Sequence, residues 1–126
     1  MIEILPLKDQ EKEDKILSSL NETSETAKVL MMAEGSEDLG YVAVKLIGDS
    51  LVYLAFEIYN SENMMPFEKE FYLDTLMRSG ASYGENHGAN KLETANNLYN
   101  DFFKKKGFKT DLFHAFAPMS LIVHYE

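Results

Sequence analysis

The chain has 126 residues, a net charge of -9 and no cysteine, which excludes disulfides, thiolate metal sites and cysteine nucleophiles. The acidic balance argues against nucleic acid and anionic membranes as partners, because both repel a negative surface. The length fits one domain over residues 1–126. The sequence shows no signal peptide and no apolar run long enough to span a membrane, so we expect a cytoplasmic protein.

The first half of the chain is predicted to hold one helix and four strands. In chain order these elements are a strand over 2–7, a helix over 8–20, and strands over 27–34, 41–48 and 50–59. The last of them is almost continuously apolar and rich in β-branched and aromatic residues, as expected of a central strand covered on both faces. We therefore expect Val52, Leu54, Phe56 and Ile58 to be among the most buried residues.

The second half is predicted to alternate helices with shorter strands. In chain order these elements are a helix over 66–89, a strand over 91–95, a helix over 96–107, and strands over 108–116 and 119–126. Gly80 and Gly84 fall on the apolar face of the first helix, where each costs about 1 kcal/mol of helix stability, which indicates close backbone approach to a sheet. The whole order predicts an α/β (α+β) fold with a mixed central sheet flanked by helices.

The start of the long helix, PFEKEFYLDTLM, stands where many α/β folds bind a phosphate, directly after a strand and a short loop. Pro66 suits the first position of a helix, and Glu68 and Glu70 interact favourably with the helix dipole, typically by 0.3–1 kcal/mol each. The simplest interpretation is a well-started helix. The alternative is a cofactor site that has been lost or rebuilt.

Three short segments of the second half resemble a known family. The helix ending His87-Gly88-Ala89, the Asn96 after the next strand, and the Gly107-Phe108 that closes the next helix occur in the order and spacing of the GNAT superfamily of acyl-CoA-dependent N-acyltransferases. The strand over 50–59 matches that family's fourth strand, and the resemblance covers roughly residues 40–126. It implies a GNAT-like domain in which pantetheine lies between two splayed strands and pyrophosphate sits at the start of the long helix.

The resemblance also implies a set of site residues. Glu57 would act as the general base, and Tyr99 as the acid that protonates a leaving thiolate. Acetyl-CoA or CoA would be the cofactor, and its contacts would be Phe56, Ile58, Lys69, Asn96 and Phe103. From the residues alone, Glu57 is also consistent with a carboxylate at a strand end and Tyr99 with packing. No metal site is expected, because His87, His114 and His124 do not have ligand spacing.

The sequence departs from the family at two motif positions and also in size, since one helix, over 8–20, replaces the two that usually shape the acceptor pocket. The family's phosphate motif, Gln or Arg, two residues, Gly, one residue, then Gly or Ala, falls on residues 68–73, where Glu68, Phe71 and Leu73 hold the defining positions. Phe71 or its neighbours are expected to occupy the volume that the pyrophosphate fills in relatives, with a sheltered position favoured for the Phe71 ring. The second departure is Phe103, which stands where relatives often carry the tyrosine acid. We therefore expect binding of acetyl-CoA or CoA to be weak or absent.

Two functions remain open on this evidence, beside a third and weaker one, a domain that acts only through self-association. One is an N-acyltransferase with an altered mode of cofactor binding and doubtful activity. The other is a non-catalytic GNAT-like module that binds a protein partner or a small ligand, and a homodimer is possible. Fold alone does not decide between them.

Overall fold

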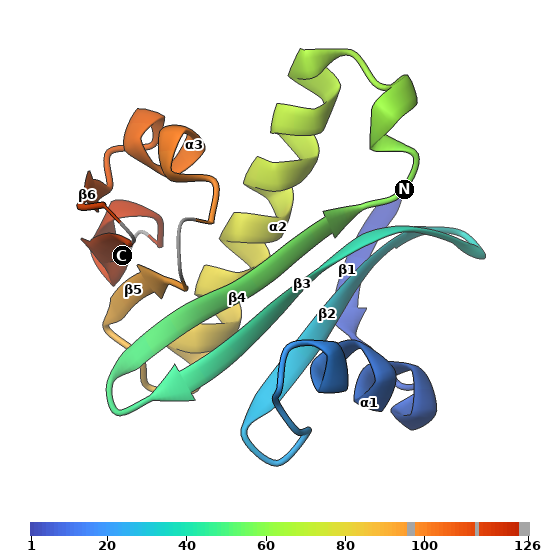
Figure 1. Cartoon of the computed structure of the whole chain (residues 1–126), viewed down its shortest axis with the longest axis horizontal. Helices are drawn as coiled ribbons and strands as arrows, with labels where there is room; N and C mark the ends of the chain where they lie inside the picture. The colour runs from blue at the N-terminus through green and yellow to red at the C-terminus, as the bar shows by residue number, and fades with distance from the viewer. Residues whose placement is uncertain (96–97, 113, 124–126) are drawn as a thin grey trace.

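The computed structural model describes residues 1–95, 98–112 and 114–123 (Figure 1). Its seven strands form one mixed sheet in the order β1-β2-β3-β4-β5-β7-β6. The strands are β1 (Ile2–Pro6), β2 (Ala27–Glu34), β3 (Glu37–Ile47), β4 (Ser50–Ile58), β5 (Lys91–Thr94), β6 (Lys109–Thr110) and β7 (Ala115–Pro118). The helices are α1 (Gln10–Ser19), α2 (Pro66–Asn86) and α3 (Asn100–Lys105), with 3-10 turns at Ser61–Asn63 and Met119–Leu121. None of these described helices is long and apolar enough to cross a membrane.

The predicted fold class is confirmed, but several boundaries differ, among them the start of β3 at Glu37, where the sequence predicted a strand from residue 41. The structure begins α3 at Asn100, whereas the sequence predicted a start at residue 96. The strand predicted over 119–126 is wrong over its described part, because a 3-10 turn occupies Met119–Leu121 and residues 124–126 lie outside the described residues. Met119 and Ile122 are buried and lie three residues apart, which is the spacing of a turn and not of a strand.

The central strand β4 carries an irregularity that the sequence did not predict. Its pairing with β3 shifts between Ala43 and Val44, so that Leu54 is the extra residue of a β-bulge. The bulge shifts the side-chain alternation, and Leu51 and Tyr53 before it join Phe56 and Ile58 after it in one core. Val52, Phe56 and Ile58 are buried as predicted, but the prediction for Leu54 is wrong because its side chain is only half-buried.

The long helix α2 packs against β4 at a distance set by glycine. A Cβ atom added at Gly80 would lie 2.7 Å from Tyr53 Cε1, and one at Gly84 would lie 2.7 Å from Leu51 Cβ. Both distances are too short for a side chain to fit without movement, so the predicted close approach of helix and sheet is confirmed. The buried Tyr53 hydroxyl donates a 2.6 Å hydrogen bond to the Met77 carbonyl, which ties the two layers together.

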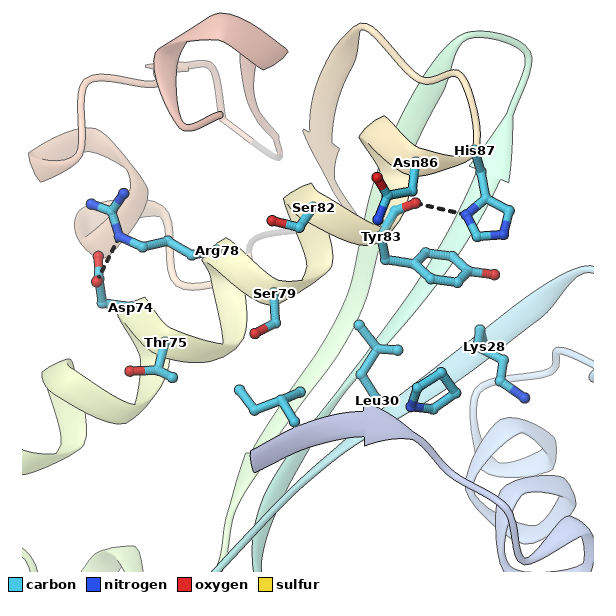
Figure 2. A pocket seen from close by; sticks show the side chains of 12 residues that line it. Lys28, Leu30, Asp74, Thr75, Arg78, Ser79, Ser82, Tyr83, Asn86 and His87 are labelled. Atoms are coloured by element: carbon cyan, nitrogen blue, oxygen red, sulfur yellow. Dashed lines mark hydrogen bonds and ion pairs between the residues drawn. The ribbon is translucent and has the colours of Figure 1, made fainter. Parts of the chain in front are cut away.

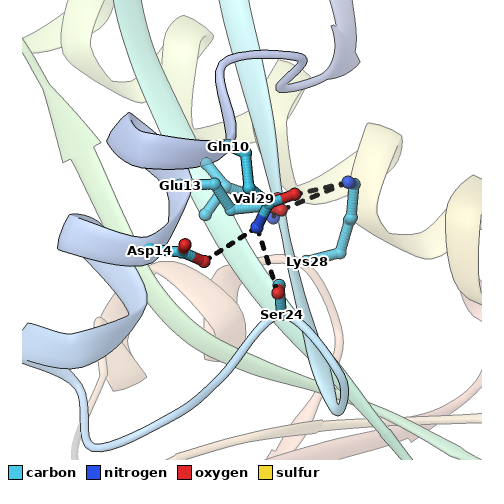
Figure 3. A network of polar contacts seen from close by, with 6 residues as sticks. All are labelled: Gln10, Glu13, Asp14, Ser24, Lys28 and Val29. Atoms are coloured by element: carbon cyan, nitrogen blue, oxygen red, sulfur yellow. Dashed lines mark hydrogen bonds and ion pairs between the residues drawn. The ribbon is translucent and has the colours of Figure 1, made fainter.

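Helix α1 is attached to β2 through a buried carboxylate (Figure 3). Leu7 N–H donates to the Val29 carbonyl at 2.9 Å, as in an antiparallel ladder, but the Val29 N–H donates instead to Glu13 Oε2 at 3.0 Å. The Lys28 ammonium lies 3.3 Å from the same oxygen, and the Glu13 side chain is almost fully buried. Glu13 therefore takes the place of a strand partner for the backbone of β2.

Candidate functional site

The sheet opens between β4 and β5. The two strands pair in parallel from Ser50 with Lys91 to Tyr53 with Thr94, and Ala95 N–H donates the last hydrogen bond to the Tyr53 carbonyl at 2.8 Å. Beyond this point β5 ends, whereas β4 continues to Ile58. The edge of β4 that faces β5 is thus free of that strand over its last five residues, beside the bulge at Leu54.

Aromatic rings from β4 and α3 meet beside this opening. Phe56 lies 5.8 Å from Tyr99 and 6.0 Å from Phe103, measured between ring centroids. Phe103 also lies 5.5 Å from Tyr53 and is fully buried. Ring pairs at these separations add roughly 0.5–1.5 kcal/mol beyond their area burial, so the cluster fastens α3 to the sheet.

Tyr99 contacts the ring of Phe56 and is affected by the negative charge of Glu57, the next residue of β4. Glu57 is exposed on the strand, and Tyr99 is the half-buried residue that precedes α3. Burial raises the pKa of the Tyr99 phenol, and the negative charge of Glu57 raises it further. Tyr41, which pairs with Glu57 across β3 and β4, has its pKa raised by the same two causes in the same order. Tyr99 consequently keeps its proton at neutral pH.

The start of α2 leaves few backbone donors free. A helix N-terminus normally offers four unpaired N–H groups. Here Pro66 has none, and the N–H groups of Glu68 and Lys69 both donate to the Met65 carbonyl, at 3.0 and 3.2 Å. Residues 70–73 lie inside the helix, where each N–H faces a carbonyl of the preceding turn. Three of the first four positions are therefore unable to receive an anion.

Comparisons with known proteins support the fold. No family model matches the sequence, and no curated protein matches it. Among solved structures, the ribosomal-protein-S18-alanine N-acetyltransferase from Escherichia coli matches with a TM-score of 0.67 and 9% identity, covering 94% of each chain. A Bacillus subtilis acetyltransferase in complex with CoA matches with a TM-score of 0.67 and 11% identity, covering 94% of this chain and 99% of that one. The aminoglycoside 6'-N-acetyltransferase from Enterococcus faecium matches with a TM-score of 0.68 and 8% identity, covering 93% and 97%.

A protein assigned to the GNAT family, from Desulfovibrio desulfuricans, also matches, with a TM-score of 0.65 and 8% identity over 94% of this chain and 99% of that chain. The chain has the GNAT fold. At these identities the comparisons establish the fold alone, so the roles of individual residues depend on the geometry of this chain.

The structure places the residues that the GNAT resemblance implied in different surroundings. Tyr99 contacts Phe56, and Glu57 is exposed on β4, while Phe56, Ile58 and Phe103 lie in the core beneath the opening; the catalytic roles of Glu57 and Tyr99 remain predictions. Lys69 is half-buried near the start of α2, a different element from those that carry these rings. Asn96 lies outside the described residues. As cofactor contacts these five residues remain predictions.

The expected sheltered position of Phe71 is wrong. The ring is 58% exposed and touches the ring of its neighbour Tyr72 at 5.8 Å. The reason is the phase of α2, whose buried face runs through Leu73, Leu76, Met77 and Gly80 and leaves Phe71 on the outer side. The prediction assumed that the Phe71 ring would be buried because burial removes it from water. The orientation of α2 instead leaves the ring exposed.

A groove of about 780 Å³ lies between α2 and the strands β1 and β2 (Figure 2). Its floor is apolar, with Ile4, Pro6 and Leu30, and α2 forms a polar wall. The hydroxyls of this wall belong to residues one turn apart, which are Thr75, Ser79 and Ser82. Sequence reasoning missed this groove, because no periodicity shows that α2 leaves β1 uncovered. The described residues contain no group of three or more His, Asp or Glu side chains placed to hold a metal ion.

Asp74, at one end of the groove, joins α2 to the end of α3. Its carboxylate oxygens lie 2.8 Å from Arg78 Nε and 3.0 Å from Lys106 Nζ. Burial raises the pKa of Asp74, but the hydrogen bonds and charges of Arg78 and Lys106 outweigh it and lower the pKa overall. Lys106, at the end of α3, is thus paired with a carboxylate of another helix.

A lowered folded-state pKa predicts a pH-dependent contribution to stability. The ionised Asp74 stabilises the fold fully above its unfolded pKa of about 3.9, and this contribution is lost as the pH falls through the folded pKa. Urea unfolding of the wild type and Asp74→Asn should therefore differ most at pH 7, and the difference should narrow towards pH 3. A difference that stays constant or widens on acidification would contradict this assignment.

Proposed function

We propose that this chain is a relative of the GNAT acyl-CoA N-acyltransferases that has lost the pyrophosphate site and works as a non-catalytic module that binds a small ligand or a protein. The observation that supports this most is the start of α2 at Pro66, before the positions 68–73 on which the family motif would fall. The residues there do not fit a pyrophosphate, because the N–H groups of Glu68 and Lys69 are used by the Met65 carbonyl and the following ones by the helix.

Charge at the same place opposes a pyrophosphate as well. Glu68 is exposed and Glu70 half-buried in the first turns of α2, with Lys69 as the cation between them. Two like charges about 5 Å apart repel by about 1 kcal/mol in water-like surroundings and by about 3 kcal/mol near a protein surface. The helix dipole is already matched by these carboxylates, so an incoming anion gains less from it.

Titration calorimetry with acetyl-CoA, CoA and pantetheine tests this proposal. We expect dissociation constants for acetyl-CoA and CoA weaker than about 1 mM, which corresponds to less than about 4 kcal/mol of binding. Pantetheine lacks the pyrophosphate, so it should bind no more weakly than CoA. Micromolar binding of CoA together with much weaker binding of pantetheine would overturn the proposal, since it would require a working pyrophosphate site.

The groove beside α2 is the candidate ligand site of such a module. Its volume of about 780 Å³ lies in the range of small-molecule sites, and it combines an apolar floor with a few polar groups on one wall. At one end the His87 and Tyr83 rings lie 4.3 Å apart, with His87 Nδ1 2.8 Å from the Tyr83 carbonyl (Figure 2). This contact holds the two side chains at the mouth of the groove.

A second candidate function is N-acyl transfer, and one observation favours it. The negative charge of Glu57 acts on Tyr99, and in this candidate function Glu57 would accept a proton from an amine and Tyr99 would donate one. If the chain is an enzyme, Glu57→Gln and Tyr99→Phe should each reduce acetyl transfer to amines by about 10²-fold or more. Activity that both variants keep would remove this pair from the chemistry.

A further inference from the structure

The strand β1 is the outermost strand of the sheet, so only one of its two edges is paired, with β2 (Figure 1). Leu7 and Val29 continue the register of this pairing, and the Leu7 N–H donates to the Val29 carbonyl. Because backbone groups alternate between the two sides of an antiparallel strand, the N–H and C=O groups of Ile2 and Ile4 point away from β2. No hydrogen bond joins these groups to another described part of the chain. Pro6 faces the same way and offers a carbonyl.

A hollow lies on each face of this free edge. Ile4 and Pro6 line the groove of about 780 Å³ between β1, β2 and α2 (Figure 2). Glu3 and Leu5, whose side chains point to the other face of the strand, line a second hollow of about 300 Å³. A free edge between two hollows suits an extended peptide, because the backbone of the peptide pairs with the edge and its alternate side chains enter the two hollows.

The side chains along the edge determine which peptide fits. Leu5 is 53% exposed, so an apolar side chain opposite it would cover it. Glu3 and Lys8 are exposed and line the same hollow, and neither forms an ion pair within the described residues. Cross-strand pairs of opposite charge stabilise a sheet, and like charges destabilise it. The charges therefore favour a peptide with a basic residue opposite Glu3 and an acidic residue near Lys8, in the order that an antiparallel strand presents as acid first and base later.

We propose that the free edge of β1 binds an extended segment of a partner protein as an additional antiparallel strand of the sheet. This names the partner of the binding module proposed above and rests on that function. The peptide residue opposite Ile4 donates to the Ile4 carbonyl and accepts from the Ile4 N–H, and its apolar side chain enters the groove above Leu30. The residue opposite Leu5 is also apolar and faces the second hollow, and the residue opposite Glu3 is lysine or arginine.

Fluorescence anisotropy of the full chain with the labelled octapeptide DTSVVKVT tests the edge. In the antiparallel register the second valine of the peptide lies opposite Ile4 and its lysine lies opposite Glu3. We expect saturable binding with a Kd below about 1 mM. Methylation of the backbone nitrogen of the second valine removes the N–H that donates to Ile4 and should weaken binding about tenfold. The matched control is methylation of the backbone nitrogen of the lysine, whose N–H points away from β1, and it should change the Kd by less than about twofold.

Charge reversal identifies the register of the peptide on β1. Glu3→Lys should weaken binding about fivefold, and a peptide with glutamate in place of lysine should recover most of the loss in this variant. Glu93→Lys makes the same charge change at an exposed position of β5, which β2, β3 and β4 separate from β1, and should leave binding unchanged. Circular dichroism confirms that each variant is folded.

Several results would overturn the proposal. These are no saturable binding up to about 1 mM peptide, an equal loss for the two methylated peptides, or no recovery with the charge-reversed peptide. A stable dimer of the free chain in which the Ile2 and Ile4 amides are already protected from hydrogen exchange would also overturn it, since a second copy would then occupy the edge. Micromolar binding of CoA would instead refute the proposed function, whatever the peptide results.

Discussion

Replacing Gly84 by valine is expected to lower the free energy of unfolding by about 3 kcal/mol. A Cβ atom at this position would meet Leu51 Cβ and Cγ at 2.7 Å, and Leu51 is fully buried near the start of β4. These atoms lie close to the backbone, so no rotation of the leucine relieves the clash. The helix must move away from the sheet, and the contacts of Tyr53 with Met77 are strained with it.

The matched control is Ser82→Val, two residues earlier on the same helix. Ser82 is exposed along the groove, so its variant has the same β-branched side chain in α2 without a clash against β4. Urea unfolding followed by circular dichroism gives both free energies. Equal losses in the two variants would show that helix propensity, and not the approach of α2 to β4, explains the effect.

Replacing Glu13 by alanine is expected to cost a similar amount, about 3 kcal/mol. The substitution leaves the Val29 N–H without its acceptor and the Lys28 ammonium without the carboxylate at 3.3 Å, both beside a buried site (Figure 3). Breaking a buried pair from one side costs far more than the pair contributes, because the remaining polar groups stay desolvated. Glu13→Gln keeps an acceptor for Val29 and should lose less.

Glu11→Ala is the control for this prediction. Glu11 lies in the first turn of the same helix and is exposed, so its removal should change the free energy of unfolding by only a few tenths of a kcal/mol. Thermal unfolding of the three variants gives the ranking. A Glu13→Ala variant as stable as Glu11→Ala would contradict the role of Glu13 as the partner of β2.

The sequence predicts the sheet and the long helix well because local patterns encode them. The continuous apolar run of β4 and the glycines at positions 80 and 84 both describe the same packed layer, and the structure bears them out. The bulge at Leu54 has no such local signal, because it results from the register between β3 and β4. It is also what decides which side chains of β4 face α2.

In the candidate site, too, the sequence predicted some features and missed others. Glu57 and Tyr99 were identified through their positions in a family pattern, and the fold brings Tyr99 against Phe56, the neighbour of Glu57, from elements over forty residues apart in sequence. Phe71 was misplaced because its environment depends on the rotation of α2 about its axis. The groove over β1 depends on where two layers fail to overlap, and no single segment of sequence carries that information.

The N-terminus of α2 connects these observations to function. In this chain the helix starts early, a proline opens it, and its own carboxylates occupy the positive end of the dipole. The surface that results is apolar and acidic. Three of the first four positions of α2 offer no free N–H group to a phosphate. The chain has the GNAT fold, and our proposal is that the part of it that would hold a pyrophosphate has changed.

Residue-resolved NMR of the backbone amides during a titration with CoA tests this central claim most directly. The amide signals of Phe67 to Leu73 report on the groups that a pyrophosphate would have to contact. The account predicts that these signals show no saturable change up to about 1 mM CoA, and that the amides of residues 70–73 are protected from hydrogen exchange by the helix. Saturable shifts centred on these amides at micromolar CoA would contradict it.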